Sequence, residues 1–502
     1  MSVPEARAAI VALILLSAAA IACSPPPRLA ADLVVTNASV WTGNPTLPAA
    51  AAVAVIGDRI VDVGAAEEIE RWRGPSTVGV DAKGRRLFPG FNDAYVRVVD
   101  GGTALDEVDL ADAGTADEFA RRINERARAK PGEWLLGGQW DERSWTPPEL
   151  PTRALIDDIT NSSPVFVVRY DGRMALANAA AMGRAGLTEH TPDPPGGAIV
   201  RGANGFPTGV LQGAAMDIVA RVLPKVTAEQ RRRAVKRALE LAESFGVTSV
   251  QDAGASYEDV AAYAELANRG ELTVRVYAVP PEAGWYDQAK LGLRQAFGSP
   301  WLRIGAVRAL IDGSEVPAEI RTRLMAADHA GLQLVADAVG EGSASATIAL
   351  LDDIARANGG RDRRSQMAAS RLTPADLDRL ASLHVVARLH SDLDRTVTGP
   401  LLAKQVAVSF GTGWPSAPLN PMLAIGAAVA RGVPVADALS AYTRGSAFAE
   451  FQEGAKGTIA RGALADLVIL SDDPLAIPAS RIKDVRVLTT IAGGKIVHQR
   501  KP

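Results

Sequence analysis

Charged side chains stand at the ends of several strand-like apolar runs in this sequence. Asp93, Asp312 and Asp337 lie at or just after such runs, and carboxylate oxygens are the ligands that a hard cation such as Mg²⁺ prefers. Arg97 and Arg308 occupy the same kind of position, and an always-protonated guanidinium repels a cation. The pattern fits either an oxygen-only metal site or a set of ion pairs. The ion-pair interpretation predicts that Arg97 or Arg308 lies near Asp337, within the ~8 Å range of weakly screened charges.

Histidine and cysteine, the usual ligands of zinc, are scarce. The chain has one cysteine, Cys23, and five histidines: His190, His329, His384, His390 and His498. None of these histidines pair at the spacings of one, three or four residues that put two imidazoles on one side of a strand or helix. Zinc needs three or four nitrogen, sulfur or oxygen ligands at about 2.0–2.3 Å. The sequence therefore predicts no metal site and no bound cofactor.

The composition is that of an ordinary globular protein. The chain has 502 residues, of which 47% are hydrophobic and 22% charged, so it can bury a large core. Its formal net charge of −3 gives no reason to expect a nucleic-acid partner.

The N-terminus has the pattern of an export signal. Residues 8–22 form an unbroken apolar run, too short to cross a bilayer but typical of a signal-peptide core. The run ends at Cys23, in a context similar to a bacterial lipobox, and prolines follow it. We therefore expect a signal peptide at 1–22, a lipidated Cys23 with a stiff tether over 23–31, and a membrane-anchored lipoprotein of the cell envelope. The alternative is an ordinary cleaved signal with a chance cysteine.

Strand-like segments at both ends of the chain enclose a long α/β middle. Residues 32–86 and 456–502 predict a small composite β-sandwich, and residues 87–455 an α/β, TIM-type (β/α)8 barrel. Residues 100–245, with a long helix at 228–245, predict an inserted α+β subdomain. Three of the helices expected in the middle are Tyr257–Asn268, Ser343–Ala357 and Pro374–Leu383, the last capped by Thr373. The eight expected barrel strands are Leu87–Phe91, Val247–Gln251, Val274–Ala278, Ile304–Ile311, Leu332–Ala336, Gln366–Ala369, Val385–Leu389 and Val406–Phe410.

A series of short motifs, in order along nearly the whole mature chain, resembles a known family. The frames include Leu87–Asp93, Gly205–Leu211, Gly246–Gly254, Ile304–Ser314, Gly331–Gly340, Gly411–Pro418 and Leu464–Ser471. Together they resemble the amidohydrolase superfamily, in its N-substituted formamide deformylase-like branch (amidohydrolase family 3). The resemblance implies a barrel that hydrolyses non-peptide C–N bonds of amides or formamides with a divalent metal such as zinc.

The positions that bind metal in that family hold other residues here. By resemblance, a His-x-His pair should stand at Tyr95 and Arg97. Likewise a lysine should stand at Arg308, a histidine at Asp337, a histidine near Ala368-Ala369 and an aspartate at Gly413. Arg173 replaces a further histidine of the inserted subdomain. A neutral tyrosine is a poor ligand, and glycine and alanine side chains offer none.

The sequence thus predicts an amidohydrolase-like protein that is metal-free and inactive and that binds a small-molecule ligand or a partner. One alternative is an active C–N hydrolase with an atypical oxygen-ligand site; another is an interaction lipoprotein at the membrane surface. Tryptophans 140, 145, 285 and 414 are candidates for the mouth of a pocket or, equally, for core packing. The candidate pocket residues are Asp93, Trp140, Asp141, Arg173, Asp312 and Trp414.

Overall fold

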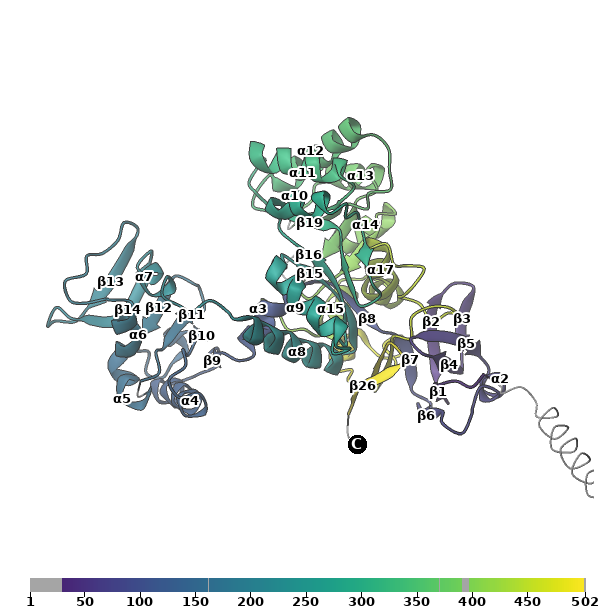
Figure 1. The fold of residues 1–502 in the computed structure, drawn as a ribbon, viewed down its shortest axis with the longest axis horizontal. Coiled ribbons are helices and arrows are strands. Elements are labelled where there is room, and N and C mark those ends of the chain that lie inside the picture. The colour runs from purple at the N-terminus through teal and green to yellow at the C-terminus, as the bar shows by residue number, and fades with distance from the viewer. Residues whose placement is uncertain (1–28, 161, 370, 391–396, 501–502) are drawn as a thin grey trace, which may run out of the picture.

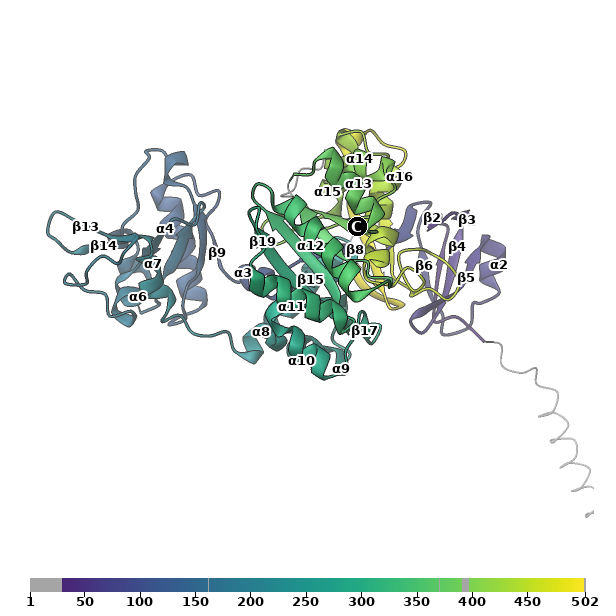
Figure 2. The same ribbon diagram turned by 90° about the horizontal axis from the view of Figure 1, so that it is seen from above.

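The computed structural model describes residues 29–160, 162–369, 371–390 and 397–500. In both views an inserted sheet lies on one side of a central α/β unit, and the N-terminal strands lie on the other (Figures 1 and 2). The predicted signal peptide and Cys23 lie outside the described residues, as does most of the predicted tether. In the part of the chain that is described, no helix is both long and apolar enough to cross a membrane.

Strands from both ends of the chain form two sheets. The first is antiparallel except at β6 and has the order β5 (Arg59–Gly64), β4 (Ala52–Ile56), β1 (Leu33–Thr36), β6 (Val78–Asp81), with helix α2 (Ala66–Glu70) packed on it. The second has the order β26 (Lys495–Gln499), β25 (Val487–Ala492), β24 (Leu467–Leu470), β7 (Arg86–Pro89), β2 (Ser39–Asn44), β3 (Leu47–Ala50). One hydrophobic cluster contains residues of both sheets, including Val53 and Leu467. The two termini therefore share a core.

The central unit has an α/β fold built on two sheets of mainly parallel strands. One has the order β17 (Phe297–Gly298), β18 (Leu302–Ile304), β16 (Arg275–Val279), β15 (Val247–Ala253), β8 (Phe91–Val96), with only β17 antiparallel. The other has the order β19 (Ala306–Asp312), β20 (Gln333–Val339), β21 (Gln366–Ala369), β22 (Val386–Leu389), β23 (Val408–Phe410). Single parallel bridges join the sheets at both seams, from Val96 to Trp414 and from Pro281 to Arg308.

Helices alternate with these strands and cover them, as parallel strands require. Thr373 caps α13 through a capping box with Asp376, which confirms the predicted start of that helix. The observed bounds of α9 and β21 are those predicted from the sequence. The helices of the central unit are α3 (Val98–Ala104), α8 (Ala228–Ser244), α9 (Tyr257–Asn268), α10 (Trp285–Lys290), α11 (Ala318–His329), α12 (Ser343–Asn358), α13 (Pro374–Ser382), α14 (Thr398–Ala403), α15 (Pro421–Ala430), α16 (Val435–Ser440), a π-helical turn (Ala441–Gly445), α17 (Ser446–Ala449) and α18 (Ala479–Ile482).

Three sequence predictions need correction. The expected strand Ile304–Ile311 is divided between β18 and β19. The expected strand Leu87–Phe91 is divided between β7 of the terminal sheet and β8 of the central sheet. The chain passes between the sheets at Gly90, where any Cβ would collide with the side chain of Thr248. Helix α8, assigned from sequence to the insertion, packs against α3 and α9, and its apolar face belongs to the central core.

The inserted sheet has a core of its own. Its strand order is β13 (Gly197–Arg201), β14 (Pro207–Gly213), β12 (Met174–Ala177), β11 (Phe166–Arg169), β10 (Gly137–Trp140), β9 (Val108–Asp109). Helices α4 (Ala116–Ala129), α5 (Asp157–Thr160), α6 (Ala179–Arg184) and α7 (Met216–Ala220) accompany it. Two apolar clusters are drawn from these elements and their loops, so the insertion is a separate packed layer.

Candidate functional site: an arginine–aspartate cluster at the strand ends

Five side chains from four strands meet near the carboxyl ends of the central strands, and we call them the Asp337 cluster. They are Tyr95 of β8, Arg308 of β19, Asp337 of β20, Arg388 of β22 and His390 just beyond β22. In α/β proteins, ligands bind at this end of parallel strands because the loops that follow the strands surround it.

Asp337 is the centre of the cluster, because each of its carboxylate oxygens accepts a hydrogen bond from a different arginine. Nε of Arg308 lies 2.6 Å from Oδ2, and Nη2 of Arg388 donates to Oδ1. The prediction that Arg97 or Arg308 lies near Asp337 is thus confirmed for Arg308. Arg97 instead pairs with Asp100 of α3 at 3.1 Å. In the cluster, hydrogen bonds between the charged side chains take the place of the hydrogen bonds to water that these groups lose on burial.

Tyr95 and His390 add an aromatic layer to the ion pairs. Their rings stack with centroids 4.5 Å apart and an interplanar angle of 11°. The guanidinium carbon of Arg388 lies 4.6 Å from the centroid of the tyrosine ring, within the range of a cation–π contact. The tyrosine hydroxyl lies 3.3 Å from Nη2 of Arg308 and 3.5 Å from Oδ2 of Asp337. Tyr95 therefore contacts the cluster through both its ring and its hydroxyl.

The charges of the arginines keep Asp337 ionised. Burial by itself would raise the pKa of this carboxyl, but the positive charges of Arg388 and Arg308 outweigh burial and hold the pKa below its ordinary value. Asp337 is therefore an anion at neutral pH, with both arginines as its counter-ions.

This donor set does not fit a divalent metal. Two guanidiniums place positive charge at the oxygens of Asp337 that a metal would need. The carboxylate of Asp93 accepts from backbone N–H groups: from Thr412, at 3.0 and 3.1 Å, and from Tyr95, at 3.0 Å. Nowhere in the described ranges do three or more His, Cys, Asp or Glu side chains gather closely enough to hold a metal ion. No step of a metal-dependent reaction can be built on these residues.

The two remaining family positions offer no ligand. On β21, Gln366 contacts Gln251 of β15, whereas Met367 and Ala369 belong to the outer hydrophobic core. Because side chains alternate along a strand, Ala368 rather than Ala369 shares the face of Gln366. Gly413 has a φ of +79° and donates its N–H to the carbonyl of Tyr95 at 3.0 Å. Gly413 therefore contacts β8 through its backbone and offers no side chain to a metal.

Sequence reasoning missed Arg388 because it lies inside the apolar run that predicts β22. The signal was present, since a charged residue within a run of buried strand residues needs a partner. Its partner is 51 residues away in sequence, at Asp337, and only the pairing of β20, β21 and β22 brings the two together.

Several of the predicted pocket or mouth residues lie outside the Asp337 cluster itself. Trp140 and Trp145 are buried in the core of the insertion, 6.0 and 5.3 Å by ring centroids from Phe119 of α4, so the mouth prediction is wrong for them. Asp312 ends β19 and is exposed. Trp414 is buried against Gly101 of α3. For Trp140 and Trp145 the physical reason is apolar packing inside the insertion.

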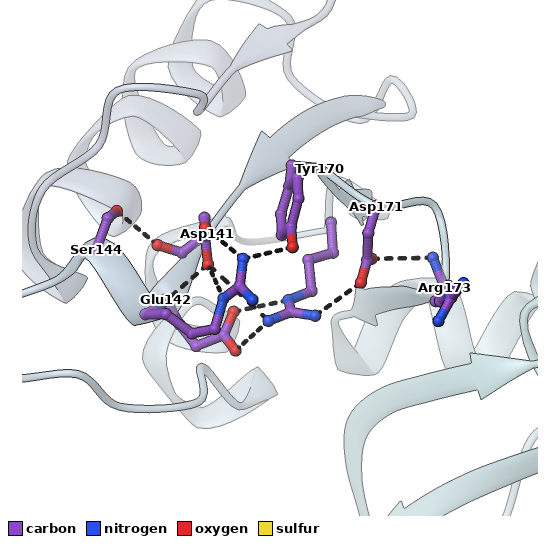
Figure 3. Close-up of polar contacts among 8 residues, drawn as sticks. Asp141, Glu142, Ser144, Tyr170, Asp171 and Arg173 are labelled. Carbon is purple, nitrogen blue, oxygen red and sulfur yellow. Dashed lines mark hydrogen bonds and ion pairs between the residues drawn. The ribbon is translucent and has the colours of Figure 1, made fainter.

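Asp141 and Arg173 belong to a polar cluster just beyond the carboxyl ends of β10 and β11 in the inserted sheet (Figure 3). Arg143 pairs with Asp141 at 2.8 Å and stands over the ring of Tyr170 at 4.9 Å. Arg169 pairs with Glu142 at 2.7 Å and with Asp171 at 2.8 Å. Arg173 joins through its backbone N–H, which donates to Asp171. These ion pairs order the loops after β10 and β11, and they are distinct from the Asp337 cluster.

A cavity of about 680 Å³ lies between the inserted sheet and the loop after β23. Its walls include Trp414 and Pro415 on one side and strands β10 and β11 on the other. Its polar lining consists of Glu107, Asp109, Gln139, Arg169 and Tyr170. Of the candidate pocket residues, Trp414 is the one that lines it.

Comparison with known proteins shows the family to which the chain belongs. Residues 78–498 match the model of the amidohydrolase family, which is most of the chain. The chain belongs to the amidohydrolase family. This amidohydrolase-family chain is 32% identical to the protein LONG AFTER FAR-RED 3 of Arabidopsis thaliana over 95% of its own length and 93% of that protein. It is 25% identical to an N-substituted formamide deformylase of Arthrobacter pascens, over 93% of this chain and 98% of that enzyme.

Solved structures share the amidohydrolase-family fold. An uncharacterized metal-dependent hydrolase from Pyrococcus furiosus has a TM-score of 0.72 at 20% identity, covering 88% of this chain and 99% of that one. The fold of this chain is therefore that of metal-dependent hydrolases, whereas its strand ends carry the Asp337 cluster.

Proposed function

We propose that this chain is a metal-free, catalytically inactive member of the amidohydrolase family that binds a small ligand at the ends of its central strands. The observation that carries the proposal is the pairing of both Asp337 oxygens with arginines, Arg308 and Arg388. A metal ion would have to displace two guanidiniums from the one carboxylate of the cluster. Such a displacement leaves buried positive charge beside the metal, which is strongly unfavourable.

We also propose that the eight parallel strands β8, β15, β16, β19, β20, β21, β22 and β23 form one closed (β/α)8 barrel. The bridges Val96–Trp414 and Pro281–Arg308 at the two seams support closure. The shared hydrophobic cluster of the terminal strands supports a composite β-sandwich beside it. In a closed barrel the Asp337 cluster occupies the mouth, where enzymes of this architecture hold their active sites.

Inactivity follows from what the family's reaction needs. In a metal-dependent amide hydrolase, the metal polarises the carbonyl and generates hydroxide, and a carboxylate acts as general base. Here the carboxylate at the centre is a salt-bridged anion with a lowered pKa, and therefore a weak base. The position that by resemblance would carry the aspartate is Gly413. Among the described residues of the Asp337 cluster, Asp337 is the one carboxylate, and its ion pairs with Arg308 and Arg388 make it a poor general base for activating water.

An activity assay tests the proposal. The purified protein is expected to hydrolyse neither N-formyl nor N-acyl amides, with or without added Zn²⁺, Mn²⁺ or Mg²⁺. The same assay on an N-substituted formamide deformylase serves as the positive control. Metal-stimulated turnover that is lost on removing the metal would contradict the proposal.

We propose further that the protein is exported and anchored to the membrane of the cell envelope by lipid on Cys23. The support is the apolar run at 8–22 that ends at the only cysteine. We expect Cys23→Ser to move the protein from the membrane fraction to the soluble fraction after cell lysis, because the acyl chains have no other attachment point. Immunoblots of the two fractions measure this, and unchanged membrane association of the variant would refute the anchor.

A further inference from the structure

The Asp337 cluster holds more positive charge than negative charge. Among its five residues, two arginines face one carboxylate, which accepts one N–H from each of them. Arg388 is 1% exposed, and its Nε is buried without a hydrogen-bond partner within the described structure. A buried guanidinium N–H group needs an acceptor, because a buried donor without a hydrogen bond is energetically costly. Among the five residues of the cluster, hydrogen-bond donors therefore outnumber acceptors, and positive charges outnumber negative charges by one.

The cluster can be reached from outside. The side chain of Arg308 is 22% exposed, whereas that of Arg388 is 1% exposed, so Arg308 is the arginine of the cluster that solvent reaches. Arg308 and Leu310 point to the same side of β19, and Asp337 and Val339 to the same side of β20, because strand side chains alternate. Leu310 is 50% exposed and Val339 49% exposed. Two exposed apolar side chains thus stand one step outward from the charged layer.

We propose that the Asp337 cluster binds the carboxylate of a small amphipathic organic acid, whose apolar part lies against Leu310 and Val339. The inference rests on the proposed function, because a metal in the cluster would exclude this mode of binding. It assigns to the proposed ligand site a chemical class: a monocarboxylate with an apolar body.

The charges favour a monoanion over a phosphate ester. The excess in the cluster is one positive charge, which one carboxylate neutralises. Asp312, at the exposed end of β19, adds a negative charge farther out on the same strand face and would repel a second negative charge on the ligand. A planar carboxylate also matches the fork of a guanidinium, with two parallel hydrogen bonds.

Calorimetric titration with octanoate tests the inference, with octanamide as the uncharged ligand of nearly equal shape. We expect octanoate to bind and octanamide to bind at least about tenfold more weakly, because the amide loses the charge-assisted hydrogen bonds. Arg308→Gln should weaken octanoate binding about tenfold or more. Arg308→Lys, which keeps the charge but not the fork, should fall between the wild type and Arg308→Gln.

Asp312→Asn is the matched control on the same strand. Removing this rim charge should strengthen octanoate binding slightly, whereas it should leave octanamide binding unchanged. Equal binding of octanoate and octanamide, no binding of either, or octanoate binding that Arg308→Gln leaves unchanged would overturn the inference. Circular dichroism of each variant establishes that it is folded before titration.

The same samples separate this inference from the proposed function. If the protein contains no stoichiometric metal and does not bind octanoate, the carboxylate inference fails while the metal-free proposal stands. If it contains about one metal ion per chain, both fail.

Discussion

Replacing Asp337 by alanine is expected to lower the free energy of unfolding by about 3–5 kcal/mol, the usual effect of breaking a buried ion pair by removing one partner. The variant leaves Arg388 fully buried and without its carboxylate, and it also takes away the partner of Arg308 Nε. The loss of stability exceeds that for an exposed ion pair, because water cannot reach the buried guanidinium of Arg388 once its carboxylate partner is gone. Urea unfolding followed by tryptophan fluorescence measures the difference.

Two further variants serve as controls for the effect of Asp337→Ala on stability. Asp312→Ala removes an exposed carboxylate on the neighbouring strand and should change stability by no more than about 0.5 kcal/mol. A triple variant with Arg308→Met, Asp337→Leu and Arg388→Met should recover much of the loss, because a complete apolar replacement leaves no unpaired charge. If Asp337→Ala is as stable as the wild type, the ion pairs do not hold the strand ends together.

The second large effect is a pH dependence of stability that originates at Asp252, outside the cluster. This carboxyl lies near the end of β15 and is fully buried. It accepts hydrogen bonds from the hydroxyl of Tyr263 on α9 and, at 3.2 Å, from the backbone N–H of Val98 on α3. Burial is the main cause that raises the pKa of Asp252 to about 7, from an ordinary value of 3.8.

The sign of the dependence follows from which state holds the proton. Between about pH 4 and pH 7 the unfolded chain releases the proton of Asp252, while the native protein keeps it. The free energy of unfolding should therefore fall as the pH rises through this window, by about 4 kcal/mol over the full range, and level off above it. Asp337 acts in the opposite direction, since its lowered pKa makes stability fall at acidic pH, below the ordinary value of 3.8.

Urea unfolding at intervals from pH 5 to pH 8 measures the slope. Asp252→Asn keeps the shape and a hydrogen-bonding side chain without a titrating proton, so its slope should be much flatter. Asp312→Asn should keep the wild-type slope. An Asp252→Asn protein whose stability varies with pH as the wild type does would show that another group controls the dependence.

The local elements of the fold could be predicted from the sequence where the determinants are local. The period of apolar residues defines α9 from Tyr257 to Asn268, and Thr373 marks the start of α13. The change of sheet at Gly90 could not be predicted, because it depends on close approach of Thr248, a residue more than 150 positions away. Helix α8 was assigned to the insertion for a similar reason: its amphipathic pattern shows a buried face but not what covers that face.

The candidate site was predictable in part. Its strand ends and the nearness of Arg308 to Asp337 follow from the types of residue at the ends of the apolar runs. Arg388 lies inside such a run, and the sequence around His390 gives no sign that its ring stacks on Tyr95. Trp140 and Trp145 show the reverse error, since a tryptophan in a motif gives no sign of whether it faces a cavity or a core.

Elemental analysis of the purified protein tests most directly the claim that ion pairs have replaced the metal centre. The protein should be incubated with excess Zn²⁺, Mn²⁺ or Fe²⁺, dialysed and then analysed, beside an N-substituted formamide deformylase treated in the same way. We predict that the bound metal stays far below one ion per chain, because Arg308 and Arg388 occupy the oxygens of Asp337. About one tightly held ion per chain, lost in Asp337→Asn, would show that the cluster is a metal site after all.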